Sequence, residues 1–137
     1  MLSERLKELK RLLNVLYGEL NEYNQLYEDC TRRELSDKGK KTVDLITEEI
    51  ERYISSLGMN EWGEFQIIHG KSIADLNKAL KRIKNTLIHN YYNLNENTLI
   101  LEDKASSNIH VARTMKQDFL NDWGRITNFV NSPGWNI

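Results

Sequence analysis

Apolar residues recur every three or four positions in four long stretches of this chain, which is the spacing of one face of an α-helix. The stretches cover residues 3–27, 40–57 or 42–57, 72–89 and 107–131, with polar or charged residues between the apolar positions. Helices with a single apolar face bury it most simply against one another. The pattern therefore predicts an all-α fold, an antiparallel, up-and-down bundle of four main helices. The apolar stripes contain Leu6, Leu9, Leu13, Leu16, Leu20, Tyr23 and Tyr27; Val43, Leu45, Ile46, Ile50, Tyr53, Ile54 and Leu57; Leu76, Leu80, Ile83 and Leu87; and Ile109 or Val111, Met115, Phe119, Trp123, Ile126 and Val130.

The segments between these stretches lack a clear helical period. Residues 29–41 read as a connector, and residues 59–71, where two glycines flank Trp62 and Phe65, as a loop or short helical turn that plugs one end of the bundle. The Asn/Tyr-rich run at 90–97 is expected to stop the third helix. Residues 98–102 are a short apolar run, and a linker follows. Trp135 and Ile137 are unusual in a tail, and we expect them to fold back on the bundle or to meet a partner.

Glycine and capping residues predict how some of the helices begin and end. Gly58 follows the second stretch and is expected to be the left-handed residue that closes that helix. Gly18 lies inside the first stretch, where glycine costs about 1 kcal/mol against alanine, so it is expected to mark a close helix crossing. Ser72 and Asp75 have the spacing of a capping box at the start of the third helix, although Glu or Gln is the usual partner.

Composition narrows the class of protein. The chain has 137 residues, which is enough to bury a core without disulfides or metal ions. We expect one helical domain over residues 1–137. A single cysteine, Cys30, excludes an internal disulfide and a cysteine-based metal site. No apolar run approaches the roughly 20 residues of a membrane span, and the first residues do not resemble a secretory signal, so we expect a cytoplasmic protein. Phosphate-binding glycine loops and zinc-type histidine spacings are also missing, so nucleotide binding by such loops is not expected and no metal site is predicted.

The net charge of −1, from 19 basic and 20 acidic residues, gives no overall attraction to a polyanion. Any nucleic-acid binding must therefore depend on local clustering of basic residues. The densest basic group lies in the connector, where Arg32, Arg33, Lys40 and Lys41 could face phosphates. The alternative is a solvated loop whose charge is partly cancelled by neighbouring carboxylates.

Candidate chemistry gathers near the expected end of the third helix. Arg82, Lys84, Asn85, His89 and Tyr91 place two cations, an amide, a titratable imidazole and a phenol within ten residues. Functional groups favour such places because a rigid element aims a mobile one. A structural alternative is that His89 caps the helix, where a cation meets the negative end of the dipole. His69 is a second candidate catalytic histidine, although a histidine at a helix entry is more often a capping or surface residue.

These residues resemble a known signature, that of the HEPN superfamily (higher eukaryotes and prokaryotes nucleotide-binding domain). Its members carry Arg, four to six residues, then His, and many add Tyr two residues later. Arg82, His89 and Tyr91 fit that pattern, with Ile83 where a polar residue is usual. A second alignment begins at Lys84 and continues through Asn85, His89 and Tyr91, which matches the tighter form of the toxin-type members except that Lys replaces Arg.

The resemblance implies an all-α bundle and a metal-independent endoribonuclease that needs no cofactor. Active members of the superfamily commonly form homodimers that bring two motifs together, so Arg82 or Lys84, Asn85 and His89 of each copy would share one site on RNA. Tyr91 matches the Tyr that a partner nucleotidyltransferase antitoxin modifies in toxin-type members, which suggests a toxin–antitoxin or phage-defence system. The alternatives are a catalytically inactive HEPN-like bundle, or an unrelated small helical subunit that binds a protein or nucleoprotein partner.

Overall fold

A computed structural model of the chain describes residues 2–29, 43–96 and 106–136, and describes side chains for residues 2–25, 43–87 and 117–135. Within these ranges all regular structure is helical, which confirms the prediction of an all-α bundle. The α-helices are α1 (Glu4–Asp29), α3 (Asp44–Ser56), α4 (Met59–His69), α5 (Ile73–Glu96) and α7 (Ser106–Val130), and a 3₁₀ turn, η2 (Pro133–Asn136), follows α7.

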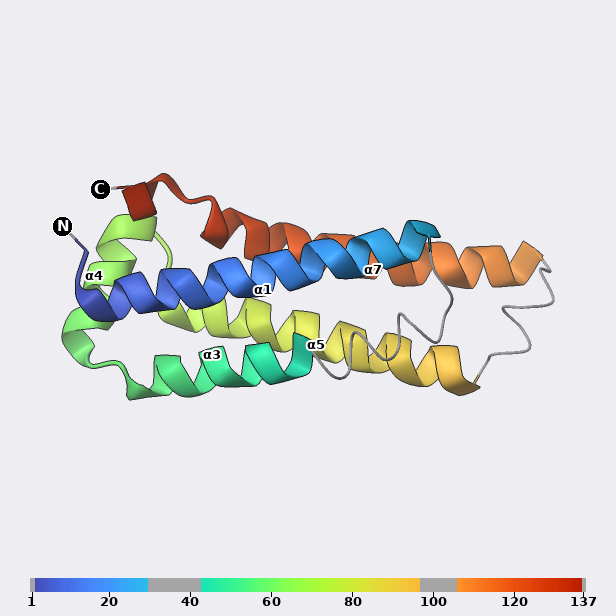
Figure 1. Ribbon diagram of the computed structural model, residues 1–137, viewed down its shortest axis with the longest axis horizontal. Helices are drawn as coiled ribbons and strands as arrows, with labels where there is room; N and C mark the ends of the chain where they lie inside the picture. Colours follow the sequence, from blue (N-terminus) through green and yellow to red (C-terminus); the bar gives the residue numbers. More distant parts are fainter. Residues whose placement is uncertain (1, 30–42, 97–105, 137) are drawn as a thin grey trace.

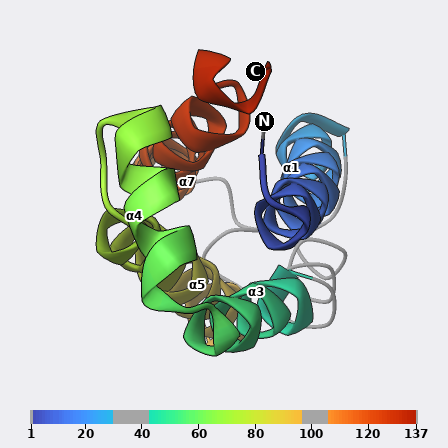
Figure 2. The same cartoon turned by 90° about the vertical axis from the view of Figure 1, so that its left-hand side faces the viewer.

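Four of the helices run side by side along the long axis of the molecule (Figure 1). Successive helices α1, α3, α5 and α7 alternate in direction, and each contacts the next, while α7 returns to contact α1. Viewed from the end, α1 lies diagonally across from α5, and α3 lies diagonally across from α7 (Figure 2). The shorter α4 crosses one end of the bundle, where it contacts α1, α5 and η2.

The apolar stripe of α1 forms one side of the core. Leucines at three- and four-residue steps along this helix are completely buried, and Tyr23 ends the buried row by packing against Phe119 of α7. The described residues of the other predicted stripes are also buried or partly buried, except that Leu45 of α3 is 64% exposed. Burial of these stripes is the main favourable term for the bundle, because each buried leucine or isoleucine contributes on the order of 1.5–3 kcal/mol.

The segment at 59–71 does plug one end of the bundle, but it does so as the regular 11-residue helix α4. Gly58 was expected to be a left-handed residue, and that prediction is wrong because its φ of −89° and ψ of 176° are extended. Only two residues separate α3 from α4, and Gly58 is the N-cap residue of α4. Its N–H donates to the Glu61 carboxylate at 3.2 Å. The left-handed residue is Gly70, with φ 66°, which ends α4.

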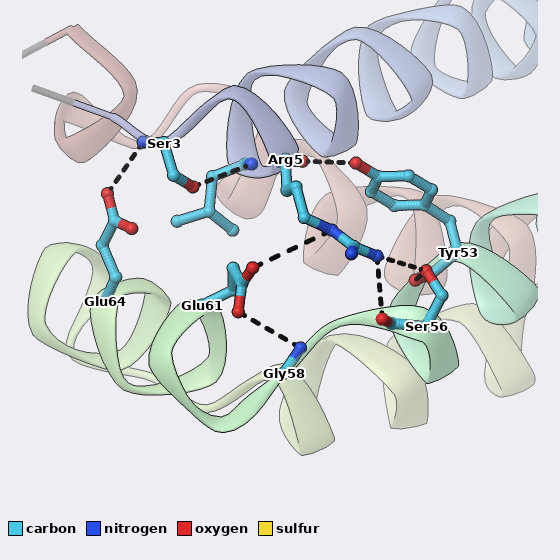
Figure 3. A network of polar contacts seen from close by, with 8 residues as sticks. Ser3, Arg5, Tyr53, Ser56, Gly58, Glu61 and Glu64 are labelled. Atoms are coloured by element: carbon cyan, nitrogen blue, oxygen red, sulfur yellow. Dashed lines mark hydrogen bonds and ion pairs between the residues drawn. The ribbon is translucent and has the colours of Figure 1, made fainter.

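A network of polar contacts ties the start of α4 to α1 and α3 (Figure 3). The Arg5 guanidinium donates to the Ser56 carbonyl and hydroxyl, each at 2.8 Å, and lies 3.9 Å from the Glu61 carboxylate. The Ser3 N–H donates to the Glu64 carboxylate at 3.1 Å, so both acidic residues of α4 reach toward α1. These contacts fix which side of α4 faces the bundle.

The start of α5 and the tail that follows α7 both agree with the sequence predictions. The capping box of Ser72 and Asp75 forms, with reciprocal backbone contacts at 3.1 and 3.2 Å. The expected fold-back of the tail is confirmed for Trp135, which is 3% exposed and whose Nε1–H donates to the Phe129 carbonyl at 2.6 Å. Ile137 lies outside the described residues.

Gly18 does not mark a close helix crossing, so that prediction is wrong. The residue is exposed, and no atom lies within 4 Å of the place that a Cβ would occupy. Gly134 is the opposite case, because its added Cβ would lie 2.7 Å from the Ile68 carbonyl oxygen and would overlap the Ile68 side chain.

We predict that Gly18→Ala raises the free energy of unfolding by about 0.5–1 kcal/mol, because alanine reduces the backbone entropy lost on helix formation and meets no neighbour. Gly134→Ala should lower it, because the η2 turn must move away from α4. Urea unfolding of the full chain, followed by circular dichroism, measures both. A Gly18→Ala variant less stable than wild type would contradict the open environment of that position.

Candidate functional site

The helix that carries the candidate residues does not stop at the Asn/Tyr-rich run, contrary to the sequence prediction. α5 continues to Glu96, seven residues beyond His89. The apolar spacing explains this, since Tyr91 and Leu94 continue the step pattern of Leu87, and packing of an amphipathic face outweighs weak intrinsic propensity. His89 is therefore inside a helix, which also removes the alternative that it caps the helix end.

A continuous α5 places three of the candidates on one stripe. Arg82, Asn85 and His89 are separated by three and four residues, the spacing of neighbours along one helix face. Arg82 and Asn85 are both exposed, and Arg82 has no ion pair with any other residue whose side chain is described. The side chain of His89 lies outside the described set, so its position is known only from the helix register.

Lys84 lies on a different side of the same helix. Its ammonium group is 3.2 Å from the Glu48 carboxylate of α3, and both side chains are partly exposed. A partly exposed ion pair of this kind contributes at most about 1 kcal/mol, so it positions the lysine more than it stabilises the bundle. Of the two possible cations, Arg82 shares a stripe with His89 and Lys84 does not.

The side chains of the remaining candidates, the basic group and Tyr91, are not described by the structure. The basic group of Arg32, Arg33, Lys40 and Lys41 lies outside the described residues. Tyr91 is in α5, four residues after the buried Leu87. The register of the helix therefore puts position 91 in line with the core-facing stripe.

A polar contact that the sequence did not reveal borders the stripe. Thr86 lies between Asn85 and His89 and donates from its hydroxyl to the carboxylate of Asp122 on α7. Asp122 is 7% exposed and also accepts from the Arg125 guanidinium at 2.8 Å. This contact fixes the rotation of α5 against α7, but a single sequence contains no signal that pairs residues 36 positions apart.

His69 was expected at the entry of the third helix. It lies instead at the C-terminal end of α4. Its ring packs between Phe65 and Trp135, each with a centroid distance of 4.3 Å, and its Nδ1 is 2.7 Å from the Ser132 hydroxyl. The ring borders a pocket of about 350 Å³ that is also lined by Lys71 and by residues at the end of α7.

The His69–Ser132 pair lacks the third member of a nucleophilic triad. No carboxylate among the described side chains contacts the ring, and its Nε2 is buried without a hydrogen-bond partner there. Burial lowers the pKa of His69, because removal from water disfavours the imidazolium ion. The geometry therefore supports a structural role, in which a neutral His69 connects α4 to the turn after α7.

The described residues do not form a metal site or a membrane span. Within the ranges that the structure covers, no three His, Cys, Asp or Glu side chains lie close enough together to hold a metal ion. None of the helices in those ranges combines the length and the apolar character that a membrane span requires.

Comparisons of the chain with protein-family models, with curated proteins and with solved structures find no match. A function for this chain is therefore inferred from its own residues and from the resemblance of the α5 motif.

We predict that the free energy of unfolding falls as the pH drops below about 6.5. The His69→Gln variant should lose less of it over the same pH range. The folded-state pKa of His69 lies below the unfolded value, so the unfolded chain takes up the proton first, and the stabilisation present above pH 6.5 declines toward the folded-state pKa. Urea unfolding of both proteins between pH 7.5 and 5 measures the difference. His89 and His110 are present in both proteins, so their contributions cancel in the difference, and parallel pH curves would contradict the assignment.

Proposed function

We propose that this protein is a metal-independent endoribonuclease of the HEPN type, with its site on the exposed stripe of α5. The observation that carries the proposal is the helical register of Arg82, Asn85 and His89, which share one stripe whose first two residues are exposed. The all-helical bundle agrees with the fold that the resemblance implies, and such bundles also serve other functions.

The residue types fit cleavage of RNA without a metal. A base removes the proton of the ribose 2′-OH, the 2′-oxygen attacks phosphorus, and the 5′-oxygen leaves with a proton from an acid. Imidazole suits both proton transfers because its pKa lies near neutral pH. Arg82 would stabilise the extra negative charge of the phosphorane-like transition state, and the Asn85 amide would hydrogen-bond to the phosphate or ribose.

One chain supplies one histidine to this stripe, whereas the reaction uses a base and an acid at the same time. A homodimer that brings two stripes together supplies two imidazoles and two guanidinium groups. The proposed active species is therefore a homodimer with a shared site, as the resemblance implies, and it needs no cofactor.

Arg82 is the proposed cation, in preference to Lys84. Lys84 is paired with Glu48, and its ammonium group is a point charge, whereas a guanidinium offers a planar fork that matches two phosphate oxygens. The basic group at Arg32, Arg33, Lys40 and Lys41 is proposed to add salt-dependent affinity for RNA.

The resemblance also suggests regulation, with a nucleotidyltransferase antitoxin modifying Tyr91 in a toxin–antitoxin or phage-defence system. That regulation requires a partner protein that carries the nucleotidyltransferase activity, and it concerns a residue other than those proposed for cleavage.

A second candidate function is a catalytically inactive helical subunit that binds a protein or nucleoprotein partner. The specific observation in its favour is the apolar outer side of α4, where Met59 is 92% exposed and Ile67 is 87% exposed.

We predict that the purified chain cleaves single-stranded RNA in EDTA, and that His89→Ala lowers the cleavage rate by about a hundredfold or more. Arg82→Ala should lower it by a similar factor, because transition-state charge loses its stabilisation. Gel analysis of end-labelled RNA measures the rate, and circular dichroism checks that helix content is retained.

Arg11→Ala is the matched control, because it removes an exposed guanidinium from α1, the helix diagonal to α5. It should cleave like wild type.

If Lys84→Ala were more damaging to cleavage than Arg82→Ala, the alignment that begins at Lys84 would replace the one proposed. Equal cleavage with and without His89 would remove the nuclease proposal, whereas RNA binding without products, weakened by reversing the charges of Arg32 and Arg33, would favour the inactive binder.

A further inference from the structure

The outer side of α4 has the reverse of the usual surface pattern. Met59, Gly63 and Ile67 follow one another at four-residue steps along this side, and Trp62 and Gln66 lie beside them. Met59 is 92%, Ile67 is 87% and Trp62 is 37% exposed. A helix that is apolar on both its inner and outer sides is normally covered on both. The outer side of α4 has no cover from the rest of the described chain.

The ionisable residues of α4 all turn toward the bundle. Glu61 bonds to the Gly58 N–H and faces Arg5, and Glu64 accepts from the Ser3 N–H (Figure 3). His69 contacts Ser132. The outward residues of the helix are therefore uncharged, and two copies of this side could approach without placing like charges against each other.

The same side offers a projection and a recess. Leu57, Gly58, Met59 and Trp62 line a pocket of about 270 Å³ at the beginning of α4. Ile67 projects near the other end of the helix, four residues beyond Gly63. Around a two-fold axis at Gly63, the Ile67 of each copy would meet the pocket of the other. No atom lies within 4 Å of a Cβ added to Gly63, so two helices can approach closely there.

We propose that two copies of this chain associate through the outer side of α4, each inserting Ile67 into the pocket beside Met59 and Trp62 of the other. An anionic membrane surface or a nucleic acid is disfavoured as the occupant, because α4 contains no Lys or Arg. A two-fold contact fits because the side is uncharged and carries both the projecting and the receiving element.

This contact is separate from the one in the proposed nuclease. α4 crosses the end of the bundle where α5 begins, whereas His89 lies in the far half of α5 (Figure 1). Association through α4 joins two bundles end to end and leaves the α5 stripes apart. The two proposals can therefore fail independently.

Sedimentation velocity of the full chain over a range of concentrations tests the contact. Wild type should form an elongated dimer that dissociates on dilution, because a contact made by one short helix is small. Ile67→Asn should raise the dimer Kd by about tenfold or more, since a central apolar anchor is lost. Leu45→Asn is the matched control on α3, with a side chain 64% exposed, and should leave the dimer Kd unchanged.

Two substitutions at Gly63 separate association from folding. Gly63→Gln should keep or raise the thermal midpoint, because glutamine favours helix, while it abolishes the dimer by blocking close approach. Gly63→Cys in a Cys30→Ser background should cross-link to its own copy under mild oxidation, and Gly18→Cys, an exposed glycine of α1, should not.

A chain that stays monomeric at every concentration would overturn the proposal, including the case in which α4 binds a different protein. If both Ile67→Asn and Gly63→Gln left the whole concentration dependence of sedimentation unchanged, the proposal would be overturned as well, since all association would then come from another contact. The first result would also count against the shared nuclease site, whereas the second would not, and the His89→Ala comparison tests cleavage by itself.

Discussion

Burial of one apolar stripe on α5 fixes the rotation of that helix, and this rotation decides which of its candidate residues face solvent. Leu76, Leu80, Ile83 and Leu87 are each at most 1% exposed. With this stripe turned into the bundle, the hydroxyl of Thr86 meets Asp122 of α7, and the ammonium group of Lys84 meets Glu48 of α3. The stripe of Arg82 and Asn85 is then the one left toward solvent.

Local sequence signals were enough to predict most of the fold. The three- and four-residue steps identified the four long helices, because burial of a continuous stripe dominates the energy of a bundle. The Ser72–Asp75 box was predictable because its partners are three residues apart. The end of α5 was not, since Asn and Tyr at 90–97 favour a stop by propensity, whereas the apolar spacing of Leu87, Tyr91 and Leu94 favours continuation to Glu96.

The same reasoning explains why α4 and the neighbours of the candidate site were missed. α4 has apolar residues on all sides, so no single period distinguishes it from a loop, and Gly58 looks the same in sequence whether it ends one helix or begins another. The Lys84–Glu48 and Thr86–Asp122 contacts join residues that are 36 positions apart in each case. Such pairs depend on how the helices are rotated against one another. The candidate motif could thus be found from the sequence, but the choice between its two cations could not.

The two uncovered surfaces of the chain lead to different kinds of assembly. A two-fold contact through the α5 stripes pairs the bundles by their sides, while a two-fold contact through α4 pairs them by their ends. A chain that uses only one of them closes as a dimer. A chain that uses both has two unlike two-fold axes, and their combination gives either a closed ring with dihedral symmetry or an open array. Because the α4 contact is small, it would dissociate on dilution, and a high local concentration of side-by-side dimers would favour it. The proposed nuclease site would then be complete in each side-by-side dimer, and the α4 contact would control how many such sites are held together on one RNA.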